Sequence, residues 1–271
     1  MDESFSIDLG VLTVEPESTY HDQAGEYLSS HLLADFRKCP LLYHQRVAGQ
    51  VERHDTPAYL VGRAAHCRLL EGNAAYQERY AVGGPVNPKT GRPFGAATKA
   101  FADWAAAQGK PVLTADQVEL IENLATGLAR NDEAVDLLLY GQPEGVVRVE
   151  YCEAPCQIRP DWVHPHRGLV DLKTCDDLTW FEADARRYGY IHQLAFYRAV
   201  LAQVLEQLLA PVHIIAIEKK EPFRCGVWRV DEASLAQAQR ENETAIRRLQ
   251  VCRTRNVWPT LYEEIRVLSA A

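Results

Sequence analysis

The amino-acid sequence predicts a mixed α/β fold in which helices flank a central sheet. Three observations support this prediction: residues 147–174 read as strand, turn and strand, residues 212–230 read as a second strand pair, and helical patterns surround both. The chain has 271 residues, of which 47% are hydrophobic. That is enough for one large domain with a sizeable core.

The N-terminal part of the chain reads as an arm followed by helices. Residues 1–25 are irregular and acidic, and no function is assigned to them. Ser29 or Ser30 is a suitable N-cap for a helix that Pro40 interrupts. Arg37 on this helix is either a contact to a DNA phosphate or part of a solvated helix face.

A second helix is predicted from Thr56 to about Glu71, with Thr56 as its cap. His66 lies near its apolar face, where a lone histidine is more often a packed core residue than a ligand. The Gly- and Pro-rich residues 81–98 then form a long loop that Lys89 and Arg92 make basic. This loop either closes on DNA or is simply a flexible excursion.

Further helices are expected over residues 99–108, 114–130 and 133–140, before the chain enters the sheet. Glu150, on the strand before Asp161, is either another carboxylate in the cleft or a cross-strand ion-pair partner. After the sheet's strand pair, one long helix is predicted from Asp184 to Gln207. On it, Gln193 and Tyr197 are four residues apart and share a face.

The residues around the turn at 164–168 carry the chemistry. If the flanking strands pair antiparallel, Asp161 and Asp171 lie side by side, while Asp171 and Lys173 share a strand face. Two carboxylates suit Mg²⁺ or Mn²⁺, which can polarise a phosphodiester and lower the pKa of a bound water. The ammonium of Lys173 can orient that water or stabilise developing negative charge. An Asp-x-Lys alone is equally compatible with a solvated ion pair, and the upstream Pro160-Asp161 strengthens the functional interpretation.

Composition excludes several classes of protein. There is no apolar run long enough for a membrane span and no signal peptide, so a cytoplasmic protein is expected. Seven scattered cysteines indicate free thiols without a zinc site. The formal net charge of −8 argues against an extended, flat DNA-binding surface but is compatible with a concentrated basic cleft.

At these residues the chain resembles the PD-(D/E)xK nuclease superfamily. The pattern stands here as Pro160-Asp161 followed by Asp171-Leu172-Lys173. Residues 62–71 (GRAAHCRLLE) resemble the histidine helix of RecE-type exonucleases, and residues 193–197 (QLAFY) resemble the Gln-x-x-x-Tyr helix of the same enzymes. The resemblance covers roughly residues 26–265 and keeps the order of the motifs.

The resemblance implies a restriction-endonuclease-like core (146–271) beneath a helical roof (26–145), in a single nuclease domain. It implies metal binding by His66, Asp161, Asp171 and the backbone carbonyl of Leu172, with two Mg²⁺ or Mn²⁺ ions. Lys173 would assist the attacking water and Gln193 would orient it, while Tyr197 would contact the DNA backbone or support the lysine.

The implied activity is that of an exonuclease that degrades one strand of linear duplex DNA in the 5′-to-3′ direction. A homo-oligomeric ring, trimeric or tetrameric, and a single-strand annealing partner follow from the same resemblance. Two alternatives stay open: a structure-specific or single-strand endonuclease of the superfamily, and a non-catalytic protein that binds DNA ends.

Overall fold

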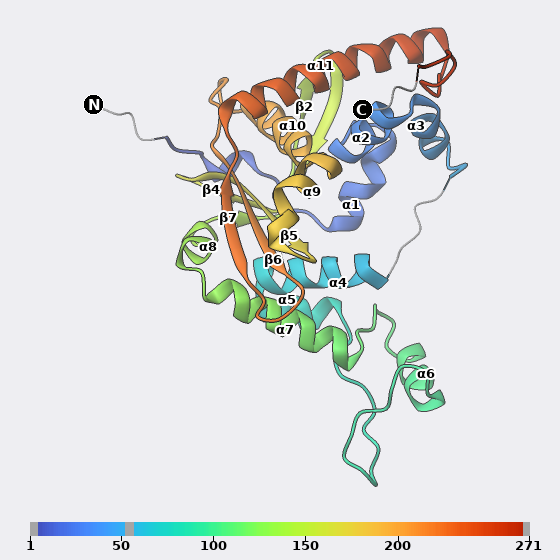
Figure 1. The fold of residues 1–271 in the computed structure, drawn as a ribbon, viewed down its shortest axis with the longest axis vertical. Coiled ribbons are helices and arrows are strands. Elements are labelled where there is room, and N and C mark those ends of the chain that lie inside the picture. The colour runs from blue at the N-terminus through green and yellow to red at the C-terminus, as the bar shows by residue number, and fades with distance from the viewer. Residues whose placement is uncertain (1–4, 52–56, 268–271) are drawn as a thin grey trace.

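The computed structural model describes residues 5–51 and 57–267, and its centre is a five-stranded mixed sheet (Figure 1). The strand order is β1-β4-β5-β6-β7, in which only the β5–β6 pair is parallel. A separate antiparallel ribbon pairs β2 with β3. The strands are β1 (Gln142–Pro143), β2 (Val147–Tyr151), β3 (Ala154–Ile158), β4 (Trp162–His164), β5 (Gly168–Cys175), β6 (Val212–Glu218) and β7 (Cys225–Arg229). The mixed α/β prediction is therefore confirmed.

Most helices precede the sheet in sequence, and the longest helix follows its last strand. The helices before the sheet are η1 (Leu9–Val11), α1 (Glu17–Asp22), η2 (Gln23–Gly25), α2 (Ser30–Lys38), α3 (Pro40–Val47), α4 (Pro57–His66), η3 (Cys67–Glu71), α5 (Gly72–Arg79), α6 (Lys99–Ala106), α7 (Ala115–Ala129) and α8 (Asp132–Leu137). After β5 come η4 (Leu178–Trp180), α9 (Phe181–Tyr188), α10 (Tyr190–Ala202) and α11 (Glu232–Arg255). Among the helices of the described ranges, none combines the length and the apolar character that crossing a bilayer needs.

The sheet separates two hydrophobic cores. On β5, Leu169 packs in the core shared with α2, α10 and α11, whereas Val170 and Leu172 pack in the core shared with α4 and α7. This alternation follows from the strand period of two. Asp171 and Lys173 therefore project toward the side that α10 covers (Figure 1).

Local sequence signals explain several helix ends. Ser29 Oγ accepts a hydrogen bond from the backbone N–H of Leu32, and Thr114 forms a capping box with Gln117, as predicted. The prediction of one helix over 184–207 is wrong, because Gly189 adopts a left-handed conformation (φ 74°) and separates α9 from α10. The predicted cap Thr56 lies outside the described residues.

Residues 81–98 form an ordered excursion with their own hairpin. Isolated bridges join Ala81 to Val112 and Val86 to Pro93. The hairpin and α6 project away from the rest of the protein (Figure 1). The Gly- and Pro-rich segment is thus a projecting arm.

Gly168, at the start of β5, fixes the turn that joins β4 to β5. Its φ is +81°, and a Cβ there would lie 2.2 Å from the carbonyl oxygen of Pro211. Both the left-handed backbone and the backbone contact exclude a side chain. We expect Gly168→Ala to lower the free energy of unfolding by about 2–4 kcal/mol in urea titrations.

Gly95→Ala is the matched control, because Gly95 lacks a positive φ and has open space around its Cβ position. Its free energy of unfolding should change by less than about 0.5 kcal/mol. Equal effects of the two substitutions would show that the turn does not constrain Gly168.

Candidate active site

The β4–β5 hairpin brings the two predicted aspartates together. Trp162 pairs with Val170, so the next position places Asp161 beside Asp171. Asp161 Oδ2 accepts a hydrogen bond of 2.8 Å from the backbone N–H of Leu172. This bond fixes the Asp161 carboxylate against β5, although Asp161 itself lies just outside β4.

Asp171 and Lys173 form a buried ion pair on β5. Asp171 is 1% exposed, and Lys173 Nζ lies 2.7 Å from its Oδ2. Neither oxygen of Asp171 has a hydrogen-bond partner of good geometry. Burial raises the pKa of Asp171 more than Lys173 lowers it. Burial also favours the neutral form of Lys173, but Asp171 and Asp161 outweigh it and raise its pKa, so the side chain carries a positive charge.

A polar chain on α10 and α2 holds the lysine. Lys173 Nζ donates to Gln193 Oε1 at 3.5 Å, and Gln193 Nε2 donates to the Tyr197 hydroxyl at 3.0 Å. Ser30 Oγ lies 3.4 Å from the same hydroxyl. The ring of Tyr190 lies 4.9 Å from the ammonium. The structure thus places Gln193 and Tyr197 where they support Lys173.

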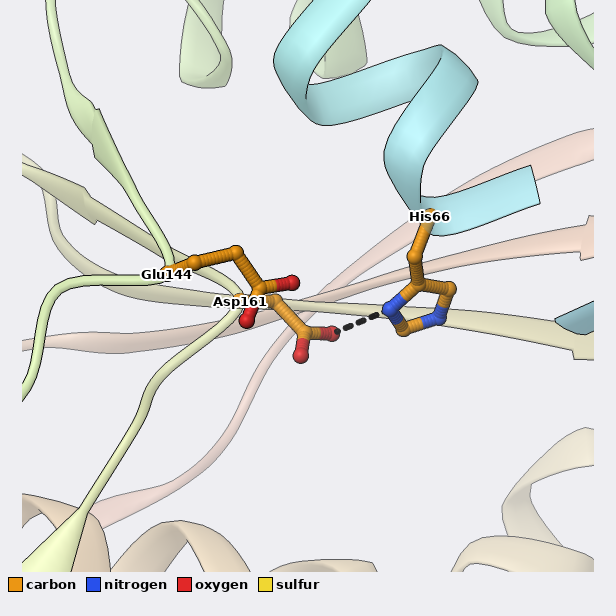
Figure 2. Close-up of side chains that lie close together, drawn as sticks. All are labelled: His66, Glu144 and Asp161. Atoms are coloured by element: carbon orange, nitrogen blue, oxygen red, sulfur yellow. Dashed lines mark ion pairs between the residues drawn. The ribbon is translucent and has the colours of Figure 1, made fainter. Parts of the chain in front are cut away.

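His66, Glu144 and Asp161 gather potential ligand atoms within 4.8 Å of one another (Figure 2). His66 ends α4, and its Nδ1 lies 3.5 Å from Asp161 Oδ2. Directly after His66, the helix continues as a π-helical turn, η3. One imidazole and two carboxylates form a donor set that suits a divalent cation.

Glu144 is the functional candidate that the sequence analysis missed. It follows β1, whose pairing with β4 continues as a hydrogen bond of 3.1 Å from Glu144 N to Asp161 O. Its φ of +54° is uncommon for a residue other than glycine and turns the side chain toward the cleft (Figure 2). β1 has only two residues, too few to show a strand period. The only available signal was an acidic residue just before the core strands.

A cleft of about 710 Å³ is lined by His66, Glu144, Asp161, Lys173, Tyr190, Gln193 and Tyr197, whereas Asp171 is buried and not part of its lining. Its walls also carry arginines that are held by carboxylates: Arg159 Nε lies 3.1 Å from Glu144 Oε2, and Arg79 binds Glu71 with two contacts of 2.5 Å. Burial and the nearby Asp161 carboxylate raise the pKa of Glu144, although Arg159 opposes them. The cleft therefore combines clustered acids with guanidinium groups that a phosphate could recruit.

Several predicted residues lie outside this cleft. Glu150 is exposed on β2 opposite Pro155, in the separate ribbon, so the structure does not bring it to the aspartates. Lys89 and Arg92 are exposed on the projecting hairpin. Arg37 faces Glu241 of α11 at 3.9 Å. The side chain of Leu172 is fully buried in the core on the α4 and α7 side of the sheet.

The triad geometry predicts metal binding with a defined pH dependence. We expect Glu144→Gln to weaken Mn²⁺ binding by at least about tenfold in calorimetry. Because the pKa of Glu144 is raised, protons compete with the metal near neutrality, so wild-type affinity should rise from pH 6 to pH 8.5.

Glu150→Gln removes the same charge from the exposed ribbon and should leave Mn²⁺ affinity unchanged. Equal affinity of wild type and Glu144→Gln would remove Glu144 from the ligand set.

The fold and site can be compared with known proteins. A solved structure from Eubacterium rectale, provisionally assigned as an exonuclease, superimposes with a TM-score of 0.68 at 18% identity and covers 96% of each chain. This likeness shows a shared fold. An alkaline exonuclease from Laribacter hongkongensis superimposes with a TM-score of only 0.37 at 13% identity, covering 87% of this chain and 93% of that one.

No curated protein matches the sequence. Residues 29–271 match the profile of a family described as a PDDEXK-like domain of unknown function (DUF3799). This match spans most of the chain and includes every residue of the cleft's aspartate, lysine and histidine cluster. The protein therefore belongs to the PDDEXK-like family, and through it to the PD-(D/E)xK nuclease superfamily that its motifs indicate.

Proposed function

We propose that the protein is a divalent-metal-dependent exodeoxyribonuclease that hydrolyses one strand of linear duplex DNA. The observation that carries the proposal is the β4–β5 hairpin, on which Asp161, Asp171 and Lys173 meet at one spot. Family membership supports nuclease chemistry, and the shared fold of the Eubacterium rectale protein is compatible with it.

The residues present fit a metal. Oδ2 of the buried Asp171 has the Lys173 ammonium at 2.7 Å, but its Oδ1 has no partner, and a metal ion would satisfy this oxygen. His66, Glu144 and Asp161 would hold one ion. We propose that Asp161, Asp171 and the Leu172 carbonyl hold a second. Mg²⁺ or Mn²⁺ at such a site lowers the pKa of a bound water and offsets phosphate charge.

The chain's own residues supply positioning and charge. Lys173, cationic and held by Gln193, would orient the attacking water and stabilise negative charge on the phosphate. Tyr197 would keep the amide of Gln193 turned toward the lysine. Arg159 would bind a phosphate oxygen once a metal competes for its partner Glu144, and Arg79, held by Glu71, lines the same cleft.

We further propose the RecE-type form of this activity. Digestion would run from 5′ to 3′ and leave 3′ single-stranded overhangs for recombination, in the cytoplasm. A trimeric or tetrameric ring would explain processive digestion, since a closed ring cannot leave the duplex before its end. A single-strand annealing protein would bind the product. The order of the motifs along the chain supports this subtype.

Digestion of end-labelled DNA tests the proposal. With Mg²⁺, we expect early loss of a 5′ label from linear duplex, slow loss of a 3′ label, an intact closed circle and no reaction in EDTA. Cutting of the circle would instead indicate an endonuclease of the same superfamily. Binding of DNA ends with no metal-dependent hydrolysis would indicate a non-catalytic end-binding protein.

Substitution of Lys173 tests the site itself. We expect Lys173→Gln to lower the rate by about 10²- to 10⁴-fold, because the group that assists the water is lost. Lys219→Gln is the matched control: this lysine pairs with the exposed Asp176 at 2.9 Å and should retain full activity. Thermal melting of both variants reports whether they are folded. A folded Lys173→Gln protein with normal activity would refute the assignment.

A further inference from the structure

The outer surface of α11 differs in charge from the rest of this acidic chain. Arg240, Arg247, Arg248 and Arg255 are exposed on this helix. At 100° per residue they fall within an arc of about 100° together with Thr244 and Val251, and Glu241 borders this arc beside Arg248. In a chain of formal charge −8, this arc concentrates four positive charges next to one bordering carboxylate.

The pairing of the arginines differs across the molecule. Several guanidinium groups are neutralised by carboxylates, as in Arg68–Glu122 and Arg148–Glu15, whereas others such as Arg130 and Arg253 bond to neutral oxygen atoms. Within residues 5–51 and 57–267, none of the four α11 arginines has a carboxylate oxygen within 4.0 Å. Their only short polar contacts are to neighbouring side chains on the same helix, such as Arg240 to Gln237 at 2.7 Å. This face is therefore free to bind an anion.

The stripe opens onto a groove between α11 and α2. The groove measures about 370 Å³, and Arg37, Arg240 and Arg248 line it. Its one acid, Glu241, lies 2.6 Å from His192 Nε2 and 3.9 Å from Arg37, so three guanidinium groups face one carboxylate. A groove with this excess of positive charge suits phosphate groups.

Helix α2 connects this groove to the cleft. Its first residue, Ser30, lies against Tyr197 in the cleft, and Arg37 near its other end lies in the groove. The helix has nine residues, which corresponds to about 13 Å. Helix α11 covers α10 and α2 on the side away from α4 (Figure 1). Helix α2 therefore spans the distance from the cleft wall to the groove.

We propose that the arginine stripe of α11, with Arg37, is a second DNA-binding surface that holds the phosphate backbone beyond the catalytic cleft. From Arg240 to Arg255 the stripe is about 22 Å long, which matches about six base pairs of duplex. A basic stripe along one helix is the electrostatic footprint of a nucleic-acid binder. A protein partner is disfavoured because Val251 is the only large apolar residue of this face, and charged residues are depleted in protein interface cores.

This inference rests on the proposed function in one respect: it takes DNA to be the polyanion that binds to the arginine stripe. The test measures binding of a 30-base-pair duplex in EDTA at several salt concentrations. For Arg247→Gln with Arg255→Gln, the slope of log Kd against log salt should fall by about two, because two phosphate contacts are lost. Arg247→Lys with Arg255→Lys keeps both charges and should retain most of the wild-type slope.

Arg130→Gln with Lys220→Gln is the matched control, since both residues are exposed and lie near the β6–β7 turn, away from α11. It removes the same charge and should leave the slope unchanged. Equal slopes for the α11 glutamine variant and the wild type would overturn the inference, as would an equal fall in the control. Metal-dependent hydrolysis by the wild type is measured separately, so the nuclease proposal can stand or fail independently.

Discussion

The antiparallel register of β4 against β5 is the constraint on which the rest of the site depends. The short hairpin places Asp161 beside Asp171, and the hydrogen bond from Leu172 N locks the first carboxylate to the second strand. A shift of one residue would turn Asp171 and Lys173 to the opposite face of the sheet and bring Val170 and Leu172 to the side they now occupy. The parallel pairing of β5 with β6 and the two cores around the sheet prevent that shift.

The arrangement of charge in the cleft follows from burial. Asp171 and Lys173 lie deep enough that neither ion would be stable alone, so they occur as a pair. Asp161 repels the charged form of Glu144 and raises the pKa of Glu144, which Arg159 offsets only in part. The cleft is thus strained electrostatically in a way that a divalent cation would relieve, while the chain keeps its overall negative charge.

Much of this arrangement could be predicted from the sequence, because strand periodicity and the short Asp-x-Lys and Gln-x-x-x-Tyr spacings are local. His66 needed the resemblance of its helix, since one histidine on an apolar face has no local signature. Glu144 could not be found, because its position depends on a two-residue strand and a left-handed backbone. Glu150 precedes Asp161 in the sequence, where another cleft carboxylate was expected. The β2–β3 ribbon that carries Glu150 ends before Pro160 and Asp161, and it is a separate sheet.

The π-helical turn after His66 decides which side chains this helix presents to the cleft. In a regular helix, His66 and Glu71 would point in directions about 140° apart, yet both line the cleft. The wider π turn, with its i→i+5 hydrogen bonds, accommodates the equivalent of one extra residue. Glu71 therefore reaches the cleft wall and holds Arg79 there, while His66 stays beside Asp161.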